Sequence, residues 1–311
     1  MITICYMTNR LQPLLEWFLD SWNNQCGGKY EGTKLVIVDF HAENEKRKEW
    51  DYLFRRILDG GGQVVHTTPK PTVWQGKYRL TKQDYFAASN ARNTALCLAP
   101  DGHIVYVDDL SVAMPGWWNA VLEASKKHDT ITCGAYAKKR EMVVENGNLI
   151  SCVDYPQGQD FRVRDCKVKD GASPCLPGWH FGCSLCAPVE AYLSINGWPE
   201  ACDNVGYEDC ITGIVMANRG WKFDFNPKMM TVESDEHHSL NRPFMRWDKG
   251  VSPNDKSHAI LRIWSKASFF DNYFGEEGIR GLRKRVLAGD PFPIMGIPEH
   301  DWYDGMPARD M

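Results

Sequence analysis

Two pairs of adjacent carboxylates stand out because each adjoins a predicted regular element. Asp108-Asp109 directly follows the apolar run 103–107, and Glu208-Asp209 opens a stretch with helical spacing. Carboxylate oxygens suit Mg²⁺ or Mn²⁺, and a cation held by the first pair would stabilise a diphosphate leaving group. A carboxylate of the second pair is suited to accept the proton of an attacking hydroxyl.

Each pair also has a simpler interpretation. An aspartate shortly before a helix is a common N-cap, and acidic residues are frequent in the first turn of any helix, where the helix dipole favours them. Neither pair therefore identifies an active site by itself, and the prediction depends on what surrounds both.

The first hundred residues alternate between short apolar runs and amphipathic stretches, as in a β-α-β-α-β unit. The runs expected to form strands are 2–6, 34–38, 63–66 and 103–107, and the stretches expected to form helices are 13–22, 45–58 and 84–98. Such alternation implies an α/β fold with a mostly parallel sheet, in which ligands bind at the carboxyl ends of the strands. The acids at 108 and 109 are expected at such an end.

After residue 115 the pattern changes to longer extended stretches. A hairpin is expected around Asn146-Gly147, because this dipeptide favours the turn between two antiparallel strands. The other expectations are strands at 130–136, 141–153, 181–186 and 221–225, helices beginning at Pro115 and Pro188 and covering 208–220, and a loop at 154–178. The second half is therefore predicted to make the sheet mixed.

Residues 236–311 are richer in proline, tryptophan and charge than the rest of the chain. We expect helices near 256–266 and 276–287 within them. The predicted organisation is one domain over 1–235 and a C-terminal extension, 236–311, packed on it.

The bulk composition predicts a globular protein. The 311 residues are 43% hydrophobic and 24% charged, and a net charge of −4 gives no global reason to bind nucleic acid. No apolar run reaches the roughly 20 residues of a membrane span, and the N-terminus lacks a signal-peptide pattern. The eleven cysteines are scattered and several lie in apolar segments, so we expect reduced thiols and a cytoplasmic location.

One cysteine spacing has two interpretations. Cys183-x-x-Cys186, with Cys175 and His180 upstream, has the residue types of a zinc site. The same two cysteines alternate with apolar neighbours as residues of a strand do, and no second paired motif completes a tetrahedral ligand set.

Further landmarks accompany the acidic pairs in a fixed order. They are Tyr6-Met7-Thr8-Asn9-Arg10, Asp39, Ser89-Asn90-Ala91-Arg92-Asn93, Phe181-Gly182, Ile195-Asn196-Gly197-Trp198-Pro199 and Gly206-Tyr207-Glu208-Asp209. With this set, the first 235 residues resemble an inverting glycosyltransferase of the GT-A fold, closest in motifs to the family-2 and β-1,4-galactosyltransferase branches. The resemblance implies a Rossmann-like nucleotide-binding half with a mixed central sheet.

The resemblance also implies an activity: inverting, metal-assisted transfer of a hexose or pentose from a nucleoside-diphosphate sugar, usually a UDP-sugar, to an acceptor hydroxyl. Its implied donor-binding residues are Thr8, Asn9, Arg10, Asp39, Arg92 and Asp108. Its implied catalytic residues are Asp209 as general base and Glu208 as the group that positions the acceptor. The candidate acceptor contacts are Trp179, His180 and Tyr207.

The implied metal site departs from the family's Asp-x-Asp pattern. Here the pattern is Val-Asp-Asp or Asp-Asp-Leu, depending on register, and we take Asp109 as the Mn²⁺ or Mg²⁺ ligand. The family's later histidine corresponds to His237 or His238, with Glu233 or Asp235 as the alternative.

Two other functions fit part of the pattern. A nucleotidyltransferase also uses strand-end acids and a divalent metal, but it typically opens with a glycine-rich basic loop that this sequence lacks. A sugar-binding protein could keep the fold without turnover.

A glycan, a small molecule and a modified DNA base are all possible acceptors. The basic and aromatic residues that would serve DNA, but also suit a solvated helix face, are Arg242, Arg246, Trp247, Arg283, Lys284 and Arg285. Nothing in the sequence sets the oligomeric state.

Overall fold

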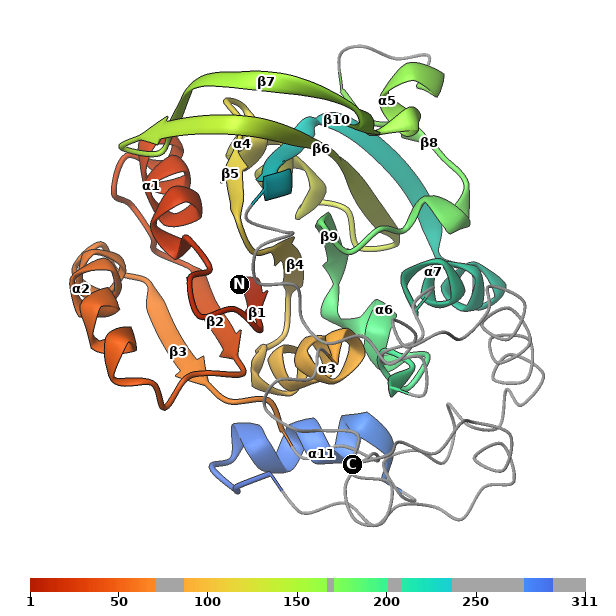
Figure 1. The fold of residues 1–311 in the computed structure, drawn as a ribbon. Coiled ribbons are helices and arrows are strands. Elements are labelled where there is room, and N and C mark those ends of the chain that lie inside the picture. Colours follow the sequence, from red (N-terminus) through yellow and green to blue (C-terminus); the bar gives the residue numbers. More distant parts are fainter. Residues whose placement is uncertain (71–86, 167–170, 201–207, 237–276, 293–311) are drawn as a thin grey trace, which may run out of the picture.

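The computed structural model describes residues 1–70, 87–166, 171–200, 208–236 and 277–292. Within these ranges one mixed sheet runs through the molecule, with helices on both faces (Figure 1). Its strand order is β3-β2-β1-β4-β9-β6-β10-β5, with β7 paired to β6 and β8 to β10. No helix in the described part of the chain is both long enough and apolar enough to cross a bilayer.

Four parallel strands form the N-terminal half of the sheet, as predicted. They are β1 (Ile2–Thr8), β2 (Thr33–Asp39), β3 (Gln63–Thr67) and β4 (His103–Asp108). The connecting elements are α1 (Leu15–Cys26), the 3-10 helix η1 (Glu45–Trp50) with α2 (Asp51–Asp59), and α3 (Ala88–Leu98). In register, Thr8 lies opposite Asp39, and Met7 lies opposite Asp108. The carboxyl ends of three strands therefore meet at one edge.

The second half of the sheet is mixed, which confirms the predicted change of pattern. Its strands are β5 (Ser111–Ala113), β6 (Thr130–Glu145), β9 (Ser184–Pro188) and β10 (Lys222–Ser234). β9 runs antiparallel to β4 and β6, whereas β6 and β10 are parallel. The helices of this half are α4 (Trp117–Ala124), α6 (Val189–Leu193) and α7 (Glu208–Asn218).

The hairpin is longer than the sequence predicts. Its turn is at Asn146-Gly147, where both residues have positive φ (48° and 74°), as expected. The partner strand β7 (Asn148–Gln159), however, continues into the predicted loop and is followed by α5 (Phe161–Asp165), so the loop prediction is wrong there. Most of β7 is exposed, so burial imposes no apolar alternation on its sequence. The rest of the predicted loop contains β8 (Ser173–Pro174) and the start of the 3-10 helix η3 (Pro177–Trp179).

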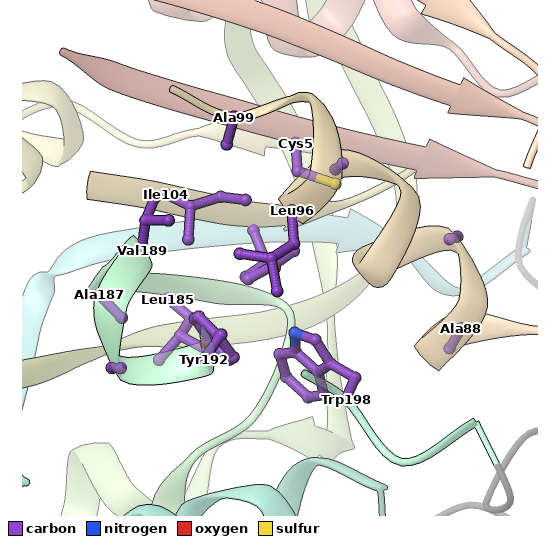
Figure 2. Close-up of a cluster of buried hydrophobic side chains, with 14 of the residues drawn as sticks. Cys5, Ala88, Leu96, Ala99, Ile104, Leu185, Ala187, Val189, Tyr192 and Trp198 are labelled. Atoms are coloured by element: carbon purple, nitrogen blue, oxygen red, sulfur yellow. The ribbon is translucent and has the colours of Figure 1, made fainter. Parts of the chain in front are cut away.

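The two faces of the sheet carry separate apolar clusters. One joins β1 and β2 to α1, α2 and α4, and its largest side chains are Trp22, Trp117 and Trp118. The other lies under α3, α6, α7 and α11 (Gly278–Leu287), where Trp198, Tyr192 and Leu96 gather (Figure 2). Helix α11 belongs to the predicted C-terminal extension and packs on α3. The boundary between 235 and 236 remains a prediction.

Candidate functional site

The loop after β1 is bound to the second acid of the first pair. Thr8 Oγ1 donates a hydrogen bond to Asp109 Oδ2 at 2.7 Å, and Arg10 Nε donates to Asp109 Oδ1 at 3.0 Å. Both carboxylate oxygens of Asp109 therefore have protein donors. Burial raises the pKa of Asp109, while Arg10 opposes that rise.

Asp108 has a different environment although it is the neighbouring residue. Its side chain is 32% exposed, and its Oδ1 atom is enclosed without a hydrogen-bond partner. The closest cation to that oxygen is Arg92 Nη2, at 3.9 Å. Desolvation raises the pKa of Asp108, and the positive charge of Arg92 partly offsets the rise. Of the two acids, Asp108 is the one with a carboxylate oxygen that has no hydrogen-bond partner.

A third carboxylate, Glu233 on β10, faces the same acids. It is buried, and burial together with the charge of Asp108 raises its pKa to about 8. Lys138 Nζ lies 3.9 Å from its Oε2 and opposes the shift. Glu233 is one of the two residues, with Asp235, that the sequence offered as alternatives to a histidine ligand.

Arg92, on α3, lies between the two acidic pairs. Its Nη1 donates to Glu208 Oε1 at 2.8 Å, and its guanidinium carbon lies 4.5 Å from the ring centre of Trp198. A Cβ atom at Gly182 would lie only 2.0 Å from Arg92 Nη2, so a glycine is required for this approach. The buried arginine thus connects the Asp108 end of β4 to the start of α7.

The second acidic pair occupies the first turn of α7, as predicted. Asp209 Oδ1 accepts the backbone N–H of Cys210 at 2.7 Å, and the residue is only half-buried. Burial and the adjacent Glu208 raise the pKa of Asp209 to about 6, although Arg92 opposes them. A carboxylate with this pKa is ionised at neutral pH and can take up a proton, as a general base must.

His180 holds the start of α7 from inside the core. It is fully buried, with Nδ1 2.9 Å from the carbonyl oxygen of Asp209 and Nε2 3.0 Å from the hydroxyl of Tyr192. Burial lowers the pKa of His180 to about 3, so the ring is neutral. The expected acceptor contact does not suit this position, because no surface of the ring faces solvent. Trp179 is half-buried beside it.

The remaining donor residues line the strand ends of β1 and β2. Both polar side-chain atoms of Asn9 are buried without a hydrogen-bond partner. Asp39 is fully buried and bound by Arg47 Nε at 2.6 Å and His66 Nε2 at 3.1 Å. Although burial acts against it, the hydrogen bonds from His66 and Arg47 lower the pKa of Asp39.

Arg47 is a structural residue that sequence reasoning missed. Its Nη2 donates to the carbonyl of Arg10 at 2.6 Å and its Nη1 to that of Leu11 at 2.9 Å. It therefore ties the loop after β1 to Asp39. Nothing distinguishes it in a charged stretch expected to be helical, so the sequence carries no signal for it.

Several predicted residues cannot be placed. Tyr207, His237 and His238 lie outside the described residues.

In the part of the chain that the structure covers, no three histidine, cysteine, aspartate or glutamate side chains are arranged to hold a metal. Cys183 and Cys186 are both buried with free thiols. Of the predicted basic residues, Arg283 binds Asp101 and the carbonyl of Ala99, and Arg285 pairs with Glu277.

No protein-family model and no curated protein sequence matches the chain. Among solved structures, GalNAc-T7 with UDP, GalNAc and Mn²⁺ superimposes with a TM-score of 0.55 at 14% identity, over 87% of this chain and 50% of that one. S. aureus TarS 1-349 in complex with UDP does so with a TM-score of 0.53 at 13% identity, over 92% of this chain and 69% of that one.

These similarities concern the fold. The chain spans half the length of the GalNAc-T7 chain, and sequence identity to both structures is low. The chain therefore has the GT-A glycosyltransferase fold that its ordered landmarks predicted.

Proposed function

We propose that the protein is an inverting glycosyltransferase that moves a sugar from a nucleoside-diphosphate donor, with UDP as the expected nucleotide, to an acceptor hydroxyl. The observation that carries the proposal is that Arg92 lies between a strand-end acid, Asp108, and Glu208, the neighbour of a proposed base, Asp209, with a pKa of about 6. The bound UDP of GalNAc-T7 and TarS supports the choice of nucleotide.

The loop after β1 supplies the proposed nucleotide contacts. Asn9 has one amide nitrogen and one oxygen buried without partners, and such groups are costly unless a ligand satisfies them. Thr8 and Arg10 fix the loop to Asp109, and Arg47 fixes it to Asp39. We assign Asn9 to direct nucleotide contact, and Asp39 to holding the loop that carries it.

The residues present fit a divalent cation at Asp108. Its enclosed Oδ1 lacks a partner, and the pKa of nearby Glu233 is raised by burial and also by the negative charge of Asp108, which a cation would offset. Asp109, which the sequence favoured, already accepts hydrogen bonds at both oxygens. We therefore propose Asp108 as the ligand, with Glu233 in support and Asp109 as the anchor of Arg10. Bound Mn²⁺ or Mg²⁺ would supply charge stabilisation for the departing diphosphate.

The proposed reaction is a single displacement. Asp209 accepts the proton of the acceptor hydroxyl while that oxygen forms a bond to the anomeric carbon of the sugar. The bond from that carbon to the diphosphate oxygen breaks, and its electron pair leaves with the nucleoside diphosphate. Attack opposite the leaving group inverts the anomeric configuration. Arg92 holds Glu208 in place by a 2.8 Å hydrogen bond, and Glu208 is proposed to orient the acceptor.

A screen of sugar nucleotides tests this function. The full chain is incubated with each UDP- and GDP-sugar and Mn²⁺, and release of nucleoside diphosphate is measured without an acceptor. Hydrolysis of at least one donor is expected, with loss on chelation by EDTA and in Asp108→Asn. The control is Asp129→Asn, which changes an exposed acid directly before the first residue of β6. Binding of donors without any release would favour a non-catalytic sugar-binding protein.

A further inference from the structure

Four aromatic side chains form a cluster next to α7. They are Tyr136, Phe161, Trp179 and Phe181, which we call the aromatic platform. Phe161 lies edge-on to Trp179 and Phe181, with ring centres 6.1 and 6.2 Å apart, and Tyr136 lies 6.4 Å from Phe181. Phe161 is 43% exposed and the other three are half-buried, so the rings present an apolar surface to solvent.

A buried arginine fixes this surface from below. Arg162 is fully buried and ion-paired with Asp160 at 2.8 Å. Its guanidinium carbon lies 4.3 Å from the ring centre of Phe181, and its Nη1 donates to the carbonyl of Trp179. The rings are therefore held in place, which lowers the entropic cost of binding a ligand on them.

The segment 179–182 connects the platform to the catalytic residues. Trp179 and Phe181 contribute rings, while the intervening His180 hydrogen-bonds the backbone of Asp209. The next residue, Gly182, packs against Arg92. In addition, η3 packs directly on α7. The exposed rings thus flank the residues that position the proposed base.

We propose that the aromatic platform is the acceptor subsite and that its occupant is the ring of a carbohydrate. The inference rests on the proposed function and narrows its acceptor to a glycan or glycoside. Sugar rings have one face of C–H groups, which packs well on aromatic rings.

The charge of the platform argues against nucleic acid. Binding a nucleic acid depends on exposed cations that neutralise phosphates. Of the two arginines of α5, Arg162 is buried against Asp160, and Arg164, although exposed, has its charge paired with Asp165. A neutral surface of rings favours a neutral sugar over a DNA base with its flanking phosphates.

The test measures binding separately from catalysis. The full chain, saturated with UDP, is titrated with methyl glycosides of glucose, galactose, mannose and N-acetylglucosamine and with an octathymidylate, and binding is followed by ligand-observed NMR. We expect at least one glycoside to bind. Phe161→Ala should weaken that binding about three- to tenfold, whereas Phe161→Tyr should retain it. Val163→Ala, equally exposed on the same helix, is the matched control.

Two results would overturn the inference: no glycoside binding to the unaltered chain, or equal binding by Phe161→Ala and the unaltered chain. Octathymidylate binding that Phe161→Ala abolishes would make nucleic acid the occupant and also overturn it. Release of nucleoside diphosphate from the sugar donor is measured in parallel for every variant. If the donor is hydrolysed but no glycoside binds, the assignment of the aromatic platform as acceptor subsite is contradicted, while the proposed function is not. If a glycoside binds but no donor is hydrolysed, the proposed function is contradicted instead.

Discussion

At the scale of single residues, the Asp209 carboxyl combines partial exposure with a backbone hydrogen bond and an acidic neighbour. Asp209→Asn keeps the shape of this side chain but removes its ability to accept a proton. We expect turnover to fall by about 10²- to 10⁴-fold, because that is the usual contribution of a general base. UDP affinity, measured by calorimetry, should change less than twofold. Near-normal turnover of the variant would exclude Asp209 as the base.

The pH dependence of activity follows from the same residue. Its pKa is raised to about 6 by burial and by Glu208, and only the ionised form can act as a base. The value of kcat/KM should therefore be level above about pH 6 and should fall roughly tenfold per unit below it. Nucleoside diphosphate release measured from pH 4.5 to 8 checks this. A rate that is level from pH 5 to 7 would contradict the assignment.

Some of the predicted residues lie together, as Thr8 and Arg10 do with Asp109, but the sequence did not predict what each one contacts. Asp108 and Asp109 are equivalent in the sequence, and they differ because Thr8 and Arg10 bind only the second. His180 illustrates the same limit. Its type suits an acceptor contact, but its burial against Tyr192 depends on the packing of distant segments.

At the scale of elements, the approach of the turn before β9 to Arg92 of α3 depends on one glycine, Gly182. Gly182→Ala would place a Cβ atom 2.0 Å from Arg92 Nη2, so the guanidinium must shift from the position in which it bonds Glu208. We expect at least a tenfold loss of turnover, because the proposed acceptor-positioning group would lose its partner. The circular dichroism spectrum should be unchanged.

Gly178→Ala provides a matched control for that change. A Cβ atom at Gly178 meets nothing within 4 Å, and its activity should remain that of the unaltered chain. Equal activity of the two variants would show that the Arg92 position does not matter for turnover.

Burial explains which elements could be predicted. The parallel strands β1, β2 and β4 are buried on both faces, so they appear as continuous apolar runs with clear limits. Strand β7 is exposed, contains Pro156 and Gly158, and pairs with β6 alone among the described strands. Its sequence therefore has the composition of a loop, since proline is tolerated at a sheet edge.

At the scale of the whole molecule, the basic C-terminal helix has a structural function. Arg283 bonds the carbonyl of Ala99 at 2.9 Å and Asp101 at 2.8 Å, and Arg280 forms an ion pair with Glu190. These arginines bind other elements of the fold. The charge that suggested DNA binding in the sequence is therefore partly used within the protein.

The buried apolar side chains of α11 lead to a prediction about whether this helix unfolds cooperatively with the sheet. Ile279 and Leu282 are buried in the cluster that also contains Leu96 of α3. Leu282→Ala should lower the free energy of unfolding by about 2–5 kcal/mol, as is typical when a buried leucine is truncated. Lys284→Ala, an exposed change on the same helix, should alter it by less than about 0.5 kcal/mol.

Chemical denaturation followed by tryptophan fluorescence and circular dichroism measures both values. If α11 is part of the same cooperative unit as the sheet, the two signals should change together in one transition that shifts to lower denaturant in Leu282→Ala. A separate early transition that leaves the main midpoint unmoved would instead mean that the helix docks on an already stable domain. In that case residues 1–235 would be expected to fold without it.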